Sequence, residues 1–298
     1  MAVKRSNGAY ARRSAGRRRK QARRRRVAWP LGLIWCVAII VAALYWVANA
    51  GPALPADKSE SAGGALQFDG SLEDVRVPEN VAQHMVEYPG FKVNFNPDMH
   101  VPNYVVWELT AEECVGTEKR LSNFFKDADV PGCATPEDYR KSGYTRGHMA
   151  PAADMKWSAE AMRASNYLTN ICPQAAAMNS GGWSTLEENC RAWARRDSAI
   201  IIVAGPVLTD RMPLHIGKSR VVVPERFFKV VLAPYADPPR GIGFLMPNGK
   251  VQGGVQSHAV SIDEVEAVTG MDFFSALPDS IEQIVERQNS YPRWQTLR

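Results

Sequence analysis

The most informative part of the chain, residues 143–191, reads GYTRGHMAPAADMKWSAEAMRASNYLTNICPQAAAMNSGGWSTLEENCR. The slightly longer segment 140–196 holds eight basic and four acidic residues, a net charge of +4. A local positive charge of this kind attracts anionic ligands, although an ordinary solvated helix face has a similar composition. The segment is therefore a candidate site for an anionic substrate.

Short runs rich in Val, Ile and aromatic residues lie on both sides of this segment and are bounded by Gly or Pro, which is typical of β-strands. The predicted strands are residues 104–109, 199–204, 227–233, 241–246 and 255–261. The predicted helices are residues 158–166, 179–196 and 262–269. The last of these starts at a Ser261–Glu264 capping box and stops at Gly270. Because strands and helices do not alternate regularly, we predict an α+β fold with an antiparallel or mixed sheet.

The N-terminal part of the chain has a different composition. Residues 1–26 hold twelve Lys or Arg and no acid, so the rest of the chain carries a net charge of −7. Residues 27–48 contain no charge, and 22 residues of helix extend ~33 Å, which matches a hydrocarbon core of ~30 Å. Residues 49–65 are rich in Ala, Gly, Ser and Pro, as flexible linkers are. We therefore predict a basic cytoplasmic tail, a transmembrane signal-anchor, a linker and an exported domain over 66–298.

This topology places the protein in the inner (cytoplasmic) membrane as a single-pass protein, with its domain facing the periplasm or the exterior. Two alternatives stay open. The small-x-small sequence ending at Ala50 is an acceptable cleavage site for a secreted protein. The Arg-rich, acid-free N-terminus also fits a mitochondrial targeting segment.

Four cysteines follow the predicted span: Cys114, Cys133, Cys172 and Cys190. Four cysteines allow three disulfide pairings, of which we favour Cys114–Cys133 and Cys172–Cys190 because each closes a short loop. Zinc-ligand spacing does not occur among the cysteines and histidines, which argues against a structural zinc site.

His148 stands out among the five histidines, because it alone follows an Arg-Gly pair in a turn-like context at a predicted strand end. A neutral imidazole accepts a proton from water near neutral pH when a backbone carbonyl fixes its other nitrogen. The other four histidines have no such context and are interpreted as structural. His148 is therefore the candidate general base.

The predicted helix over 179–196 carries a second set of candidates. Asn179, Trp183, Glu187 and Arg191 are spaced by four residues, so their side chains share one broad stripe. Trp183 is expected to pack in the core, and the other three are candidates for binding a metal-bound phosphate. Mg²⁺ keeps several waters and therefore needs few protein ligands. A capping Asn beside a surface Glu–Arg pair is the alternative that spacing leaves open.

These residues resemble the DNA/RNA non-specific endonucleases of the ββα-metal type, an endonuclease G-like group. The resemblance rests on Arg-Gly-His, Asn-Tyr-Leu-x-Asn-x-x-Pro-Gln, Asn-x-x-x-Trp and Leu-Glu in this order, and it extends from about Val93 to Leu277. It implies a ββα-metal nuclease fold with a central, mostly antiparallel sheet flanked by helices. In that resemblance His148 matches the general base, Asn179 the single protein ligand of Mg²⁺, and Glu187 the carboxylate that orients metal-bound water.

The basic residues of the motif receive roles from the same resemblance. Arg191 matches a phosphate-binding guanidinium, and Arg120 matches an upstream arginine that neutralises charge on the phosphate. Asn170 and Arg146 match motif positions with supporting roles. One departure matters: Thr145 stands where the family usually has Asp before Arg-Gly-His.

The resemblance implies an endonuclease that hydrolyses DNA and RNA without sequence or sugar specificity, and the predicted span over 27–48 makes it membrane-anchored. Mg²⁺ is the expected cofactor, with Mn²⁺ as a substitute, and a homodimer is a possible assembly. Thr145 motivates a rival prediction, a catalytically silent nucleic-acid-binding module at the cell envelope. A phosphodiesterase acting on small nucleotides or lipid headgroups is a third alternative.

Overall fold

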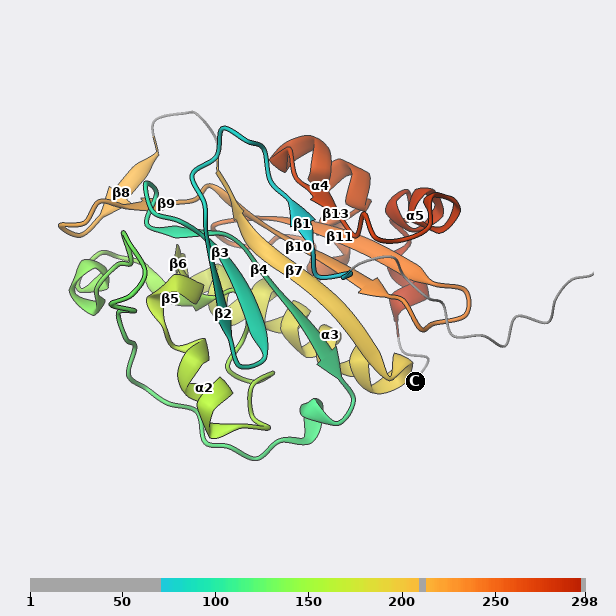
Figure 1. Ribbon diagram of the computed structural model, residues 1–298, viewed down its shortest axis with the longest axis horizontal. Helices are drawn as coiled ribbons and strands as arrows, with labels where there is room; N and C mark the ends of the chain where they lie inside the picture. The colour runs from blue at the N-terminus through green and yellow to red at the C-terminus, as the bar shows by residue number, and fades with distance from the viewer. Residues whose placement is uncertain (1–70, 209–212, 296–298) are drawn as a thin grey trace, which may run out of the picture. The chain divides into compact units, whose positions relative to one another are not determined.

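The computed structural model describes residues 71–208 and 213–295 (Figure 1). Its centre is a seven-stranded antiparallel sheet with the strand order β12-β11-β10-β7-β4-β3-β2. The strands of this sheet are β2 (His84–Tyr88), β3 (Phe91–Asn96), β4 (Val101–Thr110), β7 (Ala199–Val207), β10 (Arg226–Ala233), β11 (Arg240–Pro247) and β12 (Ala259–Val260). The α+β class and the central antiparallel sheet are thus confirmed.

Shorter elements surround the sheet. Three two-stranded pairs join β1 (Val75–Arg76) to β13 (Asp272–Phe273), β5 (Thr145–His148) to β6 (Ile171–Gln174), and β8 (Leu214–Ile216) to β9 (Val221–Val223). The α-helices are α2 (Ala159–Ser165), α3 (Ser184–Asp197), α4 (Ile262–Thr269) and α5 (Asp279–Glu286). A π-helical turn, η4 (Met178–Trp183), leads directly into α3.

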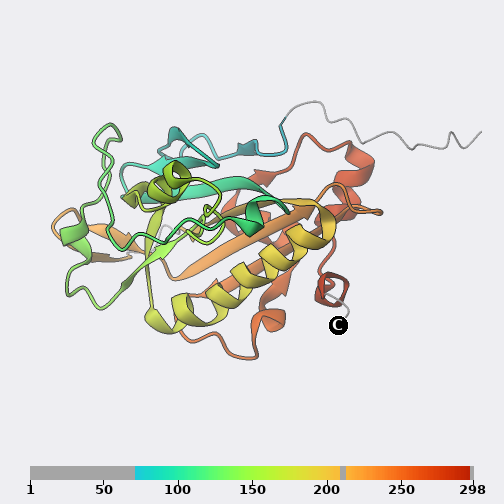
Figure 2. The same ribbon diagram turned by 90° about the horizontal axis from the view of Figure 1, so that it is seen from below.

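The sheet separates two hydrophobic cores. On one face the side chains of β4, β7 and β10 pack against α3, with Leu186 and Trp193 fully or almost fully buried. On the other face they pack against α4 and α5, where Ile262 and Val285 are buried. Figure 2 shows α3 running across its face of the sheet. The side chains of a strand alternate between the two faces, so each long strand contributes apolar residues to both cores.

The hairpin of β5 and β6 holds the Arg-Gly-His sequence in extended backbone rather than in the turn that we expected. Gly147 lies in the middle of β5, where a Cβ atom would collide with the side chain of Gln174. The glycine is therefore needed so that the side chain of Gln174 can approach the backbone of β5, not for a left-handed conformation.

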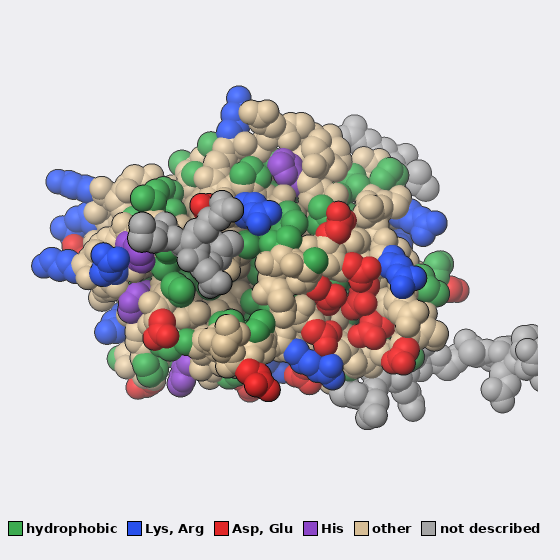
Figure 3. All heavy atoms as spheres, turned by 90° about the horizontal axis from the view of Figure 1, so that it is seen from above, with side chains coloured by type: hydrophobic (Ala, Val, Ile, Leu, Met, Phe, Trp, Pro, Cys, Tyr) green, Lys and Arg blue, Asp and Glu red, His purple; other side chains and the backbone are tan. Residues whose placement is uncertain are grey.

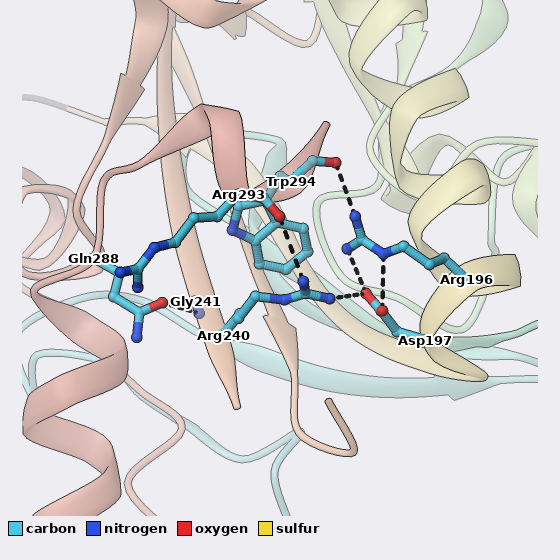
Figure 4. A network of polar contacts seen from close by, with 7 residues as sticks. All are labelled: Arg196, Asp197, Arg240, Gly241, Gln288, Arg293 and Trp294. Atoms are coloured by element: carbon cyan, nitrogen blue, oxygen red, sulfur yellow. Dashed lines mark hydrogen bonds and ion pairs between the residues drawn. The ribbon is translucent and has the colours of Figure 1, made fainter. Parts of the chain in front are cut away.

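The C-terminal end of α3 is fixed by a network of polar contacts (Figure 4). The carboxylate of Asp197 accepts hydrogen bonds of 2.6 Å from both Arg196 and Arg240. The same two guanidinium groups donate to the carbonyl oxygens of Trp294 and Arg293 in the C-terminal segment. The chain end beyond α5 thereby holds α3 against the sheet.

Most predicted elements occur close to their expected bounds, but two differ. Residues 255–261 form a 3-10 turn, η5 (Val255–His258), and only the two residues of β12 pair with β11. Within this turn, the ring nitrogens of His258 lie 3.1 Å from the carbonyl oxygens of Leu245 and Gln252. The predicted helix 179–196 begins as a π-helical turn with a non-helical Gly181, so regular four-residue spacing does not hold at its start.

The favoured disulfides are wrong, because all four cysteines of the described domain are free thiols. The sulfur atoms lie against other groups: Cys114 faces the carbonyl oxygen of Arg191, and Cys133 accepts from the backbone N–H of Asp127. The short loop that each cysteine pair would close was not a sufficient reason to predict a disulfide. No helix within residues 71–208 and 213–295 is long and apolar enough to cross a bilayer, and the predicted span over 27–48 lies outside these ranges.

Candidate active site

One cavity of about 380 Å³ opens where the start of the β5–β6 hairpin meets η4 and the first turn of α3. Its polar lining residues include Arg120, Thr145, His148, Asn179, Ser184 and Glu187. The structure therefore brings four of the predicted site residues to one place, across 67 positions of sequence from Arg120 to Glu187. Arg146, Asn170 and Arg191 do not line this cavity.

The imidazole of His148 is held by the side chain of Asn166. The Nε2 atom lies 2.8 Å from Asn166 Oδ1, and the amide nitrogen of Asn166 donates to the carbonyl oxygens of Leu121 and Asn123 at 3.1 and 2.8 Å. Because the amide nitrogen faces two acceptors, its oxygen must face the ring, so Nε2 carries the proton and donates. The other ring nitrogen, Nδ1, makes no hydrogen bond to any of the residues that the structure describes, so its lone pair can accept a proton.

Burial lowers the pKa of His148 to about 4, because the imidazolium form loses its hydration. The hydrogen bond to Asn166 opposes this shift, and the positive charge of Arg120 adds to it. The ring is therefore neutral at physiological pH. A neutral ring with one fixed N–H and one free lone pair is the form that a general base requires.

Asn179 enters the cavity from the π-helical turn, and Thr145 fixes the orientation of its amide. The Nδ2 atom of Asn179 donates to Thr145 Oγ1 at 2.9 Å, and that hydroxyl donates to the carbonyl oxygen of Gln174 at 2.8 Å. The Thr145 hydroxyl accepts one hydrogen bond and donates the other. Thr145, at the position of the usual Asp, therefore connects the amide of Asn179 to the backbone of β6. Among the described residues, Asn179 Oδ1 makes no hydrogen bond and is free to act as a ligand.

The oxygen donors of this cavity fit a hard divalent cation. Mg²⁺ takes oxygen ligands and retains several waters, so one amide oxygen with a carboxylate nearby is a suitable donor set. Glu187 supplies that carboxylate. Burial raises the pKa of Glu187 to about 7, while the charges of Lys229, Arg191 and Arg120 oppose the rise. A bound cation would add to this opposition and favour the ionised form.

Arg191 lies one turn farther along α3, where it pairs with a buried acid. Its Nη1 atom donates to Asp154 Oδ1 at 2.9 Å, and Asp154 is 1% exposed. Trp107 Nε1 donates to the other carboxylate oxygen at 3.2 Å. The guanidinium of Arg191 therefore takes part in an internal ion pair, and its contact with phosphate stays a prediction.

The two supporting residues act on backbone rather than on the cavity. Asn170 is fully buried and makes paired hydrogen bonds of 2.9 Å with the N–H and carbonyl of Ala150, so it fixes the chain just after His148. Arg146 donates to the carbonyl of Pro136, and its guanidinium lies over the rings of Phe124 and Tyr139.

Asn166, Asp154 and Lys229 belong to the surroundings of the site and were not singled out from sequence. Asn166 is the first Asn of the quoted Asn-Tyr-Leu-x-Asn pattern, so the signal for it was present. Lys229 belongs to the Phe-Phe-Lys sequence at 227–229 through which the resemblance extends, but no role was assigned to it there. Asp154 had no comparable signal, because an acid in a loop is common on surfaces.

An antiparallel hairpin followed by a helix, with an imidazole and an amide oxygen facing one cavity, defines the class of ββα-metal sites. The family described as DNA/RNA non-specific endonuclease matches residues 69–280, and the chain therefore belongs to that family. Membership implies a divalent metal as cofactor.

Two relatives and one solved structure illustrate the similarity. Nuclease EXOG, mitochondrial, of Danio rerio is 34% identical over 218 residues, which covers 67% of this chain and 63% of the relative. Endonuclease G, mitochondrial, of Bos taurus is 31% identical over 239 residues, covering 75% of this chain and 78% of the relative. A chain of the EndoG/EndoGI complex superimposes with a TM-score of 0.61 at 27% identity, covering 65% of this chain and 87% of that one. The match spans less than two thirds of the length of the EXOG relative.

Proposed function

We propose that the protein is a divalent-metal-dependent endonuclease that hydrolyses phosphodiester bonds in DNA and RNA without sequence or sugar specificity. The observation that carries this proposal is the shared cavity of His148 and Asn179. One residue offers a free imidazole nitrogen and the other a free amide oxygen, each fixed by a hydrogen bond on its far side. The two residues therefore offer a base and a cation site to the same phosphodiester.

In the proposed reaction, Nδ1 of His148 accepts a proton from the water that attacks the phosphorus atom. Asn166 keeps the ring in the required tautomer and orientation. Arg120, which is exposed at the rim of the cavity, binds a non-bridging phosphate oxygen and stabilises the charge that grows in the transition state. Mg²⁺ held by Asn179, with Glu187 beside it, would supply positive charge for the departing 3′ oxygen.

The charge distribution of the domain supports a polyanionic substrate bound on one side only. Acidic side chains gather over α4 and α5, as Figure 3 shows, and Asp263, Glu266 and Glu286 bring carboxylate oxygens within 4.8 Å of one another. This face repels a nucleic-acid backbone. The cavity instead carries Arg120 at its rim and small side chains on its walls, which favours contact with phosphate and sugar over readout of base edges.

Thr145 does not favour the rival prediction of a silent binding module. Its hydroxyl orients the amide of Asn179, which is what a metal site needs at that position. The test is incubation of the purified full-length protein with supercoiled plasmid and with RNA, in Mg²⁺ and in EDTA. Cleavage of both polymers in Mg²⁺, and of neither in EDTA, supports the proposal. Binding without cleavage would establish the silent module, and cleavage of only a small chromogenic diester would establish a small-substrate phosphodiesterase.

The cellular location of the protein is a separate proposal. Residues 27–48 have the length and composition of a single inner-membrane span that exports the nuclease domain. The EXOG and endonuclease G relatives are named mitochondrial, which supports the mitochondrial alternative for the same Arg-rich N-terminus. N-terminal sequencing of the mature protein distinguishes a retained anchor from cleavage near Ala50 or elsewhere. Alkaline carbonate extraction then tests for an integral membrane protein, and sedimentation tests for a homodimer.

A further inference from the structure

Lys229 occupies an unusual position in the hydrophobic core beneath the cavity. It lies in the middle of β10, on the face that packs against α3, between Phe227 and Val231 on the same side of the strand. The residue is 0% exposed. Its Nζ atom has no hydrogen-bond partner among the described residues. A buried ammonium without an acceptor is costly, so an apolar side chain of similar volume would serve the core better.

Two tryptophan rings enclose this ammonium. The Nζ atom lies 4.5 Å from the ring centroid of Trp183 and 5.1 Å from that of Trp107. The face of an indole ring carries partial negative charge, so each ring attracts the cation, and more strongly when water is excluded. The positive charge of Lys229 thus restrains two side chains that come from different elements, η4 and β4.

The indole N–H of each tryptophan donates a hydrogen bond to a group on a different side of the active site. Trp183 Nε1 donates to the backbone carbonyl of His148 at 3.1 Å. Trp107 Nε1 donates to Asp154, whose other oxygen accepts from Arg191 of α3. The ammonium is therefore the common point of two chains of contacts, one to the end of β5 and the other to α3.

The charge of Lys229 also acts on two acids near the site, the buried Asp154 and the partly buried Glu187. Burial raises the pKa of Asp154 and of Glu187, and Lys229 acts against the rise for both groups. Lys229 and Arg191 thus supply two positive charges beside the two acids, Asp154 and Glu187. The arrangement serves the geometry and charge of the cavity at the expense of an apolar core.

We propose that Lys229 is a positioning residue of the nuclease: clamped between Trp107 and Trp183, its ammonium fixes the backbone of His148 relative to the Asp154–Arg191 pair on α3. This inference rests on the proposed function, because the geometry it preserves is that of the hydrolytic site. A displacement of about 1 Å at a reacting group costs up to ~10²-fold in rate, so loss of the clamp should appear in kcat.

The test compares Lys229→Met with the wild type in the full-length protein, measuring kcat and KM on plasmid DNA, Mg²⁺ half-saturation and Tm. We expect kcat to fall by about 10- to 100-fold, KM and Mg²⁺ half-saturation to stay within about twofold, and Tm to stay constant or rise. Lys92→Met is the matched control, because Lys92 pairs with Glu73 at 2.9 Å and contacts neither indole. It should leave kcat unchanged.

A folded Lys229→Met protein with wild-type kcat would overturn the inference, and so would a fall in Tm large enough to explain the lost activity. If this variant does not fold, Trp183→Phe carries the test, because it keeps an aromatic face for the ammonium and removes the N–H donor to His148, together with part of a fully buried ring. Its Tm should fall because of the cavity. At a temperature where the variant is fully folded its kcat should still be reduced, and an unchanged kcat there would refute the clamp. A wild-type protein inactive on DNA and RNA would instead refute the proposed function.

Discussion

Replacing Thr145 by Val tests the orientation of the metal ligand. Valine has nearly the shape of threonine but lacks the hydroxyl that accepts from Asn179 Nδ2 at 2.9 Å and donates to Gln174 at 2.8 Å. Without that acceptor the amide of Asn179 is free to rotate, and its nitrogen then takes the place of the oxygen toward the cation. We expect weaker metal binding with the rest of the site intact.

The size of the effect follows from the single hydrogen bond that orients the ligand. A bond of this kind contributes about 0.5–1.5 kcal/mol net, and a factor of ten in affinity corresponds to about 1.4 kcal/mol. The Mg²⁺ concentration that gives half-maximal activity should therefore rise about 2- to 12-fold, with kcat recovering at saturating Mg²⁺. Asn179→Ala removes the ligand itself and should raise the metal requirement further.

The assay is initial-rate cleavage of supercoiled plasmid over a Mg²⁺ titration, with Tm measured for each variant. Thr145→Ser retains the hydroxyl and is the matched control, so its titration should stay within about twofold of the wild type. If Thr145→Val gives the wild-type titration, the hydroxyl does not orient Asn179. If instead kcat falls at every metal concentration, Thr145 acts on another step.

Four further predictions follow from the surroundings of the base and of the ion pair. His148→Ala should reduce kcat by ~10²–10⁴-fold while leaving Mg²⁺ half-saturation unchanged, and an unaltered rate in single-turnover assays would exclude His148 as the base. Asn166→Ala should lower kcat by up to ~10²-fold, because the ring loses its fixed tautomer; equal KM values on plasmid would check that binding survives. Arg191→Ala should cost about 3–5 kcal/mol of unfolding free energy in urea titrations, since it leaves Asp154 buried without its partner. Because burial lowers the pKa of His148 to about 4, below its unfolded value of about 6.5, the unfolded chain binds the extra proton first as the pH falls. The wild type should lose about 3 kcal/mol of unfolding free energy relative to His148→Ala between pH 7 and 4, and parallel pH profiles of the two proteins would contradict this.

The sequence predicted the elements whose signals are local. The helix Ile262–Thr269 has both halves of its capping box, Ser261 with Glu264, and ends at Gly270 with φ 72°, as its end residues indicated. The prediction of a strand over 255–261 was wrong for most of the run, which holds two Val but no Ile or aromatic Phe, Tyr or Trp residue. Pairing with a neighbouring strand decides whether these residues form a strand. Only two of them, Ala259 and Val260, pair with β11.

The sequence predicted part of the candidate site, because four of the seven predicted residues line the cavity, and their roles stay predictions. His148, Asn179 and Glu187 reach one cavity, in keeping with their motif positions. Arg191 belongs to the same four-residue stripe, yet its guanidinium pairs with Asp154, 37 residues earlier in the chain. Helical periodicity gives the direction of a side chain about the helix axis. It carries no information on which buried charged residue the fold places next to that side chain.

The two amides of the Asn-Tyr-Leu-x-Asn pattern show why roles require the tertiary structure. Asn166 and Asn170 are the same residue type, both are fully buried, and both use an amide nitrogen to bind carbonyl oxygens. They differ in what their Oδ1 atoms accept: Asn170 takes the backbone N–H of Ala150, whereas Asn166 takes the N–H of the His148 ring. That difference makes one residue a brace for the backbone and the other the group that sets the tautomer of the proposed base. It arises because the chain around Leu121 and Asn123 supplies the two carbonyl oxygens that fix the orientation of Asn166, more than forty residues away in the sequence.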